Sequence, residues 1–226
     1  MDISMHYVER GIGEPLVLLH GNGESSEYFK PQIEFFSASY RVIAVDTRGH
    51  GKSPRGKGRF SLSRFADDLK ELLDELGINN ANILGFSDGG NIALLFTLRY
   101  PGYVRRLILN GANLYPAGMK STVWLLIFFS WCLESIGAVF SRRSAREREL
   151  LSLMLLEPHI KPTELSSVDI PVLVIAGSHD MIRKGHTKKI HLSLKKGSLV
   201  ILHGSHFVAA ENSEAFNEAV FKFLSR

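Results

Sequence analysis

Short runs of Val, Ile and Leu recur along this chain, and segments with helical spacing of apolar residues separate them. The runs are apolar on both faces, a pattern that suits strands buried between two layers of helices. In chain order they span residues 16–20, 41–46, 82–85, 106–110, 171–177 and 198–203. Residues 5–10 are expected to add an antiparallel edge strand. Strands that alternate with helices predict an α/β fold with a mostly parallel, doubly wound sheet flanked by helices.

Residues 113–168 break this alternation, because they contain no convincing strand and both their ends are rich in turn residues. We therefore expect residues 1–112 and 169–226 to form one core and residues 113–168 to form a helical insertion. The insertion contains a strongly apolar segment, TVWLLIFFSWCL at 122–133. A membrane-spanning helix needs ~20 apolar residues, so we expect a helix that is buried or docked on the surface.

Composition and charge indicate which kinds of partner and which cellular location to expect. The chain has 226 residues and a formal net charge of +4. Its basic residues are scattered, and acids interrupt the densest cluster at 142–148, so no nucleic-acid partner is expected. The single cysteine, Cys132, excludes an intramolecular disulfide. The N-terminal stretch MDISMHYVER lacks the apolar region of a secretory signal, and a cytoplasmic location is therefore the expectation.

The stretch GFSDGG at residues 85–90 joins an apolar run to a helical segment. In that setting a Gly-x-Ser-x-Gly pattern indicates a nucleophile elbow, a tight, strained turn that lifts a serine hydroxyl clear of the strand end. Ser87 is then the candidate nucleophile. Gly85 and Gly89 are small because the turn brings them against neighbouring backbone. A chance match to a short pattern is the competing interpretation, and the strand before and the helix after Ser87 weigh against it.

A serine hydroxyl needs a base that an acid orients, and behind an elbow the acid and then the histidine follow along the chain. The run at 171–177 leads into Asp180, and the run at 198–203 leads into His206. Both positions fall at carboxyl ends of strands, where open α/β sheets place their ligand sites. Two alternatives stay open: Asp180 as a helix cap, and His203 as the base, although His203 still belongs to its predicted strand.

A tetrahedral oxyanion needs two N–H donors. We assign one to the backbone N–H of Asp88, directly after the nucleophile, and the other to Asn22 in the sequence HGNG at 20–23. The glycines of HGNG allow a backbone N–H to turn inward. A helix that begins near Asp88 also directs its N-terminal N–H groups to the same place, which favours negative charge there.

Taken together, these segments resemble the α/β-hydrolase fold superfamily. The segments HGNG at 20–23, DTRGHGKS at 46–53, GFSDGG at 85–90, GSHD at 177–180 and GSHF at 204–207 occur in the family's order and are spread over nearly the whole chain. The resemblance implies that residues 113–168 are a short cap over the active site and that His50 is structural. It argues against dehalogenase and epoxide hydrolase activities, which use an aspartate nucleophile.

The expected activity is hydrolysis of a small, apolar carboxylic ester through an acyl-enzyme, without cofactor or metal. No HExxH or Cys/His cluster is present in the sequence. Trp124 and Phe128 are the candidate substrate-binding side chains. The apolar cap leaves transient membrane contact open, and the sequence does not fix the oligomeric state. The alternatives are an amide, a thioester, an amino-acid ester bound through the Asp88 carboxylate, or a hydrolase-derived receptor.

Overall fold

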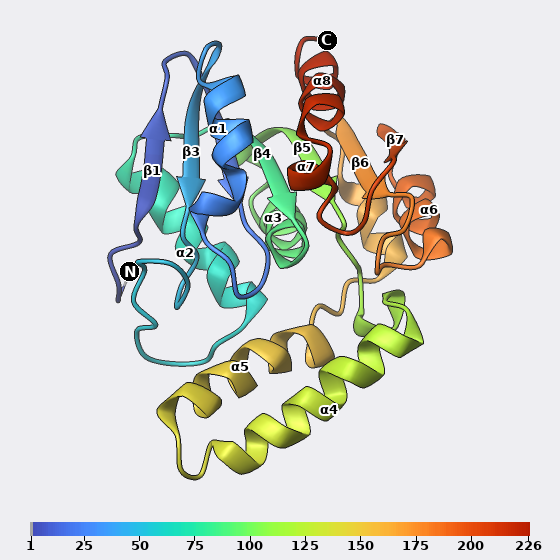
Figure 1. Cartoon of the computed structure of the whole chain (residues 1–226). Coiled ribbons are helices and arrows are strands. Elements are labelled where there is room, and N and C mark those ends of the chain that lie inside the picture. Colours follow the sequence, from blue (N-terminus) through green and yellow to red (C-terminus); the bar gives the residue numbers. More distant parts are fainter. Residues whose placement is uncertain (1) are drawn as a thin grey trace.

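The computed structural model describes residues 2–226, which contain a seven-stranded sheet with the order β1-β3-β2-β4-β5-β6-β7 (Figure 1). Strand β1 runs antiparallel to β3, and the remaining neighbours are parallel. The strands are β1 (Tyr7–Arg10), β2 (Glu14–Leu19), β3 (Tyr40–Val45), β4 (Ala81–Phe86), β5 (Val104–Asn110), β6 (Val172–Gly177) and β7 (Gly197–Leu202). The expected α/β class and the antiparallel edge strand are therefore confirmed.

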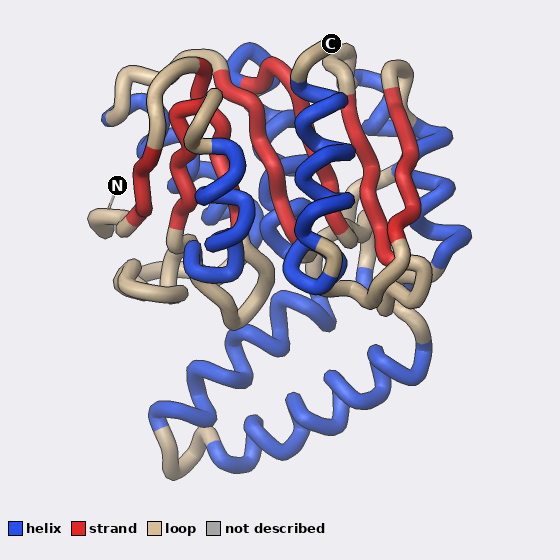
Figure 2. Tube along the Cα trace, turned by 45° about the horizontal axis from the view of Figure 1, so that its top comes forward, coloured by secondary structure: helices blue, strands red, loops and turns tan. Residues whose placement is uncertain are grey.

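Helices cover both faces of the sheet (Figures 1 and 2). They are α1 (Lys30–Phe36), α2 (Leu62–Glu75), α3 (Asp88–Arg99), α6 (Lys184–Ser193), α7 (Val208–Glu211) and α8 (Ser213–Leu224), with short 3₁₀ turns η1 (Ser26–Phe29), η2 (Pro101–Tyr103), η3 (Pro116–Gly118) and η4 (Pro162–Ser167). In β2, Val17 and Leu19 pack in the core with α2, α3 and α6, whereas Leu16 and Leu18 pack in the core with α1 and α8. Alternate strand residues point to opposite faces, and this explains why the strands are apolar throughout.

The inserted segment forms a helical hairpin of α4 (Ser121–Gly137) and α5 (Arg142–Leu156) at the carboxyl edge of the parallel strands (Figures 1 and 2). We call this hairpin the cap. In both views α5 lies between α4 and the sheet over most of its length. Met119, before α4, forms an isolated bridge with Ile182 in the loop after β6. The division into a core and a cap at 112/113 and 168/169 stays a prediction.

The observed strands begin and end within two residues of the expected boundaries. One difference affects a candidate residue: β7 ends at Leu202, so His203 lies one residue beyond the strand and not within it. None of the helices within residues 2–226 has the length and apolar character needed to cross a membrane.

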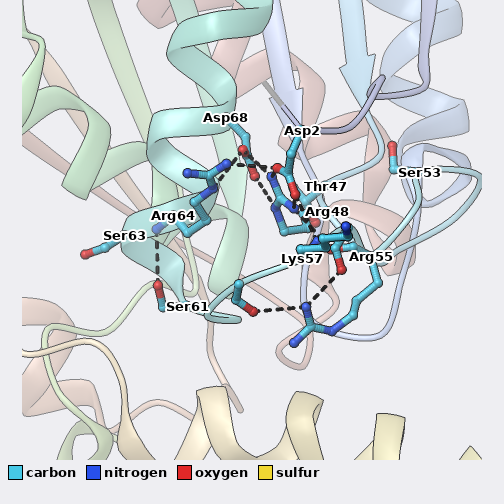
Figure 3. A network of polar contacts seen from close by, with 12 residues as sticks. Asp2, Thr47, Arg48, Ser53, Arg55, Lys57, Ser61, Ser63, Arg64 and Asp68 are labelled. Atoms are coloured by element: carbon cyan, nitrogen blue, oxygen red, sulfur yellow. Dashed lines mark hydrogen bonds and ion pairs between the residues drawn. The ribbon is translucent and has the colours of Figure 1, made fainter. Parts of the chain in front are cut away.

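A buried ion pair fixes the loop after β3, which carries the segment DTRGHGKS (Figure 3). The guanidinium of Arg48 donates from Nε to Asp68 Oδ2 at 2.6 Å and from Nη2 to Asp68 Oδ1 at 2.7 Å. Both side chains are 0% exposed. Arg48 also donates to Asp2 and to the carbonyl of Arg55. The loop is thereby attached to α2 and to the N-terminal segment.

Removal of one member of this pair should destabilise the protein strongly. Asp68→Asn leaves a buried guanidinium without its full counter-charge, and we expect a loss of about 3 kcal/mol in the free energy of unfolding. The matched control is Asp67→Asn on the same helix, which breaks a solvent-accessible pair with Arg99 and should cost less than about 1 kcal/mol. Urea unfolding of both variants measures the difference, and equal small losses would show that the buried pair does not stabilise the loop.

Candidate active site

Ser87 occupies the turn between β4 and α3 in a strained conformation. Its φ of 54° and ψ of −121° make it the one non-glycine residue with positive φ among residues 2–226. A Cβ on Gly85 would overlap the backbone of Gly89, and a Cβ on Gly89 would overlap the carbonyls of Leu19 and His20. The turn therefore closes only because both positions lack side chains, as the sequence predicted for a nucleophile elbow.

The structure brings the three candidate residues of the triad into one chain of hydrogen bonds. Ser87 Oγ lies 3.0 Å from His206 Nε2, and His206 Nδ1 lies 2.7 Å from Asp180 Oδ1. The side chains of His206 and Asp180 are 6% and 2% exposed. Because a carboxylate only accepts hydrogen bonds, Nδ1 carries the proton and Nε2 is left to accept from the serine hydroxyl.

The geometry does not favour the two alternatives that the sequence left open, Asp180 as a helix cap and His203 as the base. Asp180 Oδ1 accepts from the backbone N–H of Ile182 at 2.8 Å, but α6 begins only at Lys184 with Arg183 at its N-cap, so Asp180 does not cap that helix. His203 packs against the ring of His179, with 5.9 Å between ring centroids, and makes no described contact with Ser87.

Two further residues hold the imidazole of His206 in place, and the sequence did not reveal either. The ring of Phe86, at the end of β4, lies 4.9 Å from the His206 ring centroid. Gly111, just after β5, has a φ of +62°, and a Cβ there would lie 2.7 Å from His206 Cε1. A side chain at this position would displace the base. The signal in the sequence is only a glycine after a strand, which has many other causes.

The HGNG loop after β2 is fixed at its base by a buried histidine. Thr47 donates its backbone N–H to His20 Nε2 at 3.1 Å, so His20 Nδ1 carries the proton and donates to the carbonyl of Gly21 at 2.7 Å. Burial lowers the pKa of His20, which keeps the ring neutral in this role. His50 is also buried and contacts Thr47 and the carbonyl of Arg48, not the triad.

The two candidate oxyanion donors have no acceptors of their own. Among the described residues, no acceptor pairs with the backbone N–H of Asn22 or with that of Asp88. The side chain of Asn22 donates to the carbonyl of Leu150 in α5 at 2.7 Å, which joins the loop to the cap. The assignment of these N–H groups to an oxyanion hole stays a prediction.

Two carboxyl groups with raised pKa values lie close to the triad. Burial raises the pKa of Asp88 to about 6, although Asn91 donates to its Oδ1 at 3.0 Å. The side chain of Asn22 also lowers this pKa, although no hydrogen bond to Asp88 Oδ2 meets the distance and angle limits within the described chain. Asp88 lines a small cavity together with Asn22 and Leu153. Burial raises the pKa of Glu24, directly after the HGNG segment, to about 7. Sequence analysis missed Glu24, because only the fold brings it near His206.

The candidate substrate-binding residues lie in the outer helix of the cap. Trp124 packs against the cluster of Met119, Ile127 and Ile182, and Met181, directly after Asp180, packs against the same cluster. Phe128 stacks on Trp124 with 5.4 Å between ring centroids. Neither ring makes a described contact with Ser87. In the inner helix α5, the carbonyl of Leu150 accepts from Asn22 in the HGNG loop, and Leu153 lines the adjoining cavity. A substrate-binding role for Trp124 and Phe128 stays a prediction.

Within residues 2–226, no group of three His, Cys, Asp or Glu side chains is arranged to hold a metal ion. The polar groups of the site are the Ser87 hydroxyl and the His206 imidazole and Asp180 carboxylate that are hydrogen-bonded in sequence behind it. A serine hydroxyl paired with an imidazole and a carboxylate is an arrangement that can act as a nucleophile with its base.

Comparison with known proteins identifies the family. The model for the alpha/beta hydrolase fold matches residues 14–132. A 107-residue stretch is 41% identical to (E)-2-((N-methylformamido)methylene)succinate hydrolase of Acinetobacter baylyi, covering 47% of this chain and 41% of that protein. The chain is also 27% identical to 3-oxoadipate enol-lactonase 2 of the same species, and this match covers 100% of this chain and 94% of that protein.

Solved structures agree at the level of the fold. The enol-lactonase from Burkholderia xenovorans superposes with a TM-score of 0.83 at 23% identity, over 99% of this chain and 97% of that chain. The elbow, the order of the motifs and these matches lead to the same conclusion: the chain belongs to the alpha/beta hydrolase fold family.

Proposed function

We propose that this protein is a serine hydrolase that cleaves a carboxylic ester through an acyl-enzyme. The observation that carries the proposal is the hydrogen-bonded chain from Ser87 Oγ through His206 to Asp180. The names of its relatives support hydrolysis in general, and two of these relatives are enol-lactonases, whose names denote the opening of a cyclic ester.

The geometry suggests how the residues would share the reaction. Ser87 Oγ attacks the ester carbonyl while His206 Nε2 takes its proton, and Asp180 stabilises the imidazolium that forms. The N–H groups of Asn22 and Asp88 bind the oxyanion, and His206 returns the proton to the leaving alcohol. Water, activated by the same imidazole, then attacks the acyl-enzyme and releases the acid. The loss of one oxyanion donor typically lowers the rate ~10²–10³-fold.

Two features bear on the substrate. The cap is strongly apolar, and Ile127 and Trp124 of α4 share an apolar cluster with Met181, the residue after Asp180; this favours an apolar acyl or leaving group. The second candidate is an amino-acid ester, which the buried carboxylate of Asp88 favours, because its unpaired Oδ2 could accept from a substrate ammonium. Amides and thioesters would react at the same triad, and a receptor would hold its ligand in the same place.

Replacement of the nucleophile tests the proposal directly. Ser87→Ala should lower kcat for a simple aryl ester by at least about 10⁴-fold without a loss of folding, because it removes a single hydroxyl and no packing. A serine-directed phosphonate should label wild type at Ser87. The control, Ser225→Ala at the end of α8, should keep both labelling and turnover. Labelling at another serine would refute the assignment, and stoichiometric labelling without turnover of any ester would favour a receptor.

A substrate series separates the two candidate substrates. If the site is apolar, kcat/KM for neutral esters should rise as the acyl chain becomes longer. The Asp88→Asn variant should then have similar kcat/KM values for neutral esters and for α-amino esters of the same size. Each buried methylene contributes about 0.8 kcal/mol at most, so the rise should stay below about fourfold per carbon. A strong preference of wild type for α-amino esters, lost in Asp88→Asn, would contradict this and make Asp88 the specificity residue.

A further inference from the structure

One face of α4 is apolar and exposed along the length of the helix. We call it the α4 face, and it consists of Leu126, Phe129, Leu133 and Ile136, continued by Val139 and Phe140 in the turn to α5. These side chains are between 61% and 88% exposed. At 3.6 residues per turn, the four helical members fall within an arc of about 80°. They therefore form one continuous stripe on the side of the cap that faces solvent.

This stripe is not a by-product of the packing of the cap. The opposite side of α4 is already occupied, since Ile127 belongs to an apolar cluster against which Leu151 and Met154 of α5 pack. Surface helices of globular proteins place polar residues on the outer side, whereas α4 is apolar on both sides. A contiguous apolar surface of this kind marks an interaction site. Because the other helix of the cap cannot cover it, its partner must lie outside this chain.

Cations are placed at both ends of the α4 face. Arg142 and Arg143, at the start of α5, are exposed and have no ion-pair partner within residues 2–226. At the other end, Lys120 precedes α4, and Arg183 donates to Ser121 Oγ in its first turn. The acid of α4, Glu134, is half-buried and lies outside the 80° arc. The α4 face thus presents apolar side chains between two positive ends, with no exposed carboxylate among them.

We propose that the α4 face docks on an anionic lipid surface. The apolar stripe would enter the boundary between headgroups and acyl chains, and the cations at its ends would contact lipid phosphates. A helix of 17 residues is ~25 Å long at 1.5 Å per residue. Because no described helix can cross a membrane, α4 would lie in the plane of the interface.

The charges favour lipid over a second copy of this chain. Leu126, Phe129, Leu133 and Ile136 are spaced by three, four and three residues, which would also suit pairing of two helices. However, parallel pairing would bring Arg142 of one copy beside Arg142 of the other, and antiparallel pairing would bring it beside Lys120. The like charges would repel in either orientation, and neither face offers an acid to compensate.

Docking in this orientation has a consequence for the site. The cap lies at the carboxyl edge of the parallel strands (Figure 1), so docking through the α4 face would turn this edge of the sheet toward the lipid, with both cap helices in between. The docking proposal itself rests on the exposure and charge of α4 and does not depend on the catalytic assignment. Its test therefore uses binding and not turnover.

The test is co-sedimentation with vesicles of phosphatidylcholine alone, or with phosphatidylglycerol as about a third of the lipid. Wild type should partition at least about tenfold more strongly onto the anionic vesicles. Leu133→Ser with Ile136→Ser should lower that partition at least about tenfold. Arg142→Glu with Arg143→Glu should lower binding to anionic vesicles by a similar factor and leave binding to neutral vesicles nearly unchanged.

Each double variant has a matched control elsewhere on the surface. Ile12→Ser with Leu192→Ser removes two apolar side chains that are 86% and 79% exposed. Lys195→Glu with Lys222→Glu makes the same change in net charge on the loop before β7 and near the end of α8. Both controls should bind like wild type. Urea unfolding of every variant should give midpoints close to that of wild type, because all the replaced side chains are exposed.

Other results would overturn the proposal. Equal losses in the variants and their controls would show that binding is not localised to the α4 face. Absence of vesicle binding by wild type would refute docking on lipid. If light scattering on the same samples shows a dimer that Leu133→Ser with Ile136→Ser dissociates, and vesicles do not compete with it, the α4 face is an interface between two copies of this chain.

Discussion

The strained turn at Ser87 depends on two positions without side chains, and the rest of the site depends on that turn. Gly85 and Gly89 allow β4 to pass into α3 so closely that the hydroxyl projects beyond the carboxyl edge of the sheet. The strands β6 and β7 pair in parallel with each other and end at the same edge of the sheet, and the loops after them carry Asp180 and His206. The sheet is thus the rigid element, and the candidate reactive groups are short extensions of it.

The loops around the serine are held by buried polar contacts. His20 fixes the HGNG loop, the Arg48–Asp68 pair fixes the neighbouring loop, and Asn22 attaches the HGNG loop to the cap.

The carboxyl groups of Asp88 and Glu24 lower the stability of the folded chain when they are ionised. Their pKa values are higher in the folded chain than in the unfolded one. Both therefore lower stability as the pH rises from their ordinary pKa values to about 6 and about 7, respectively.

Much of this arrangement could be predicted from local sequence. The elbow and the positions after each strand follow from short patterns, so the sequence selected Ser87, Asp180 and His206, which the structure joins by hydrogen bonds. Gly111, Glu24 and the buried partner of Arg48 could not be found in this way, because their contacts join residues far apart in the chain. The cap was predicted as a helical segment, but its sequence alone did not show that α5 contacts the HGNG loop.

The central claim is that Ser87, His206 and Asp180 act as one unit, and a double-mutant cycle tests it most directly. His206→Ala, Asp180→Asn and the combined variant are compared by kcat for a single aryl ester. If the three side chains form a triad, Asp180→Asn should change kcat by less than about threefold once His206 is absent, because members of a triad are strongly non-additive. Losses that multiply in the combined variant would show that Asp180 and His206 act independently, and the account would be wrong.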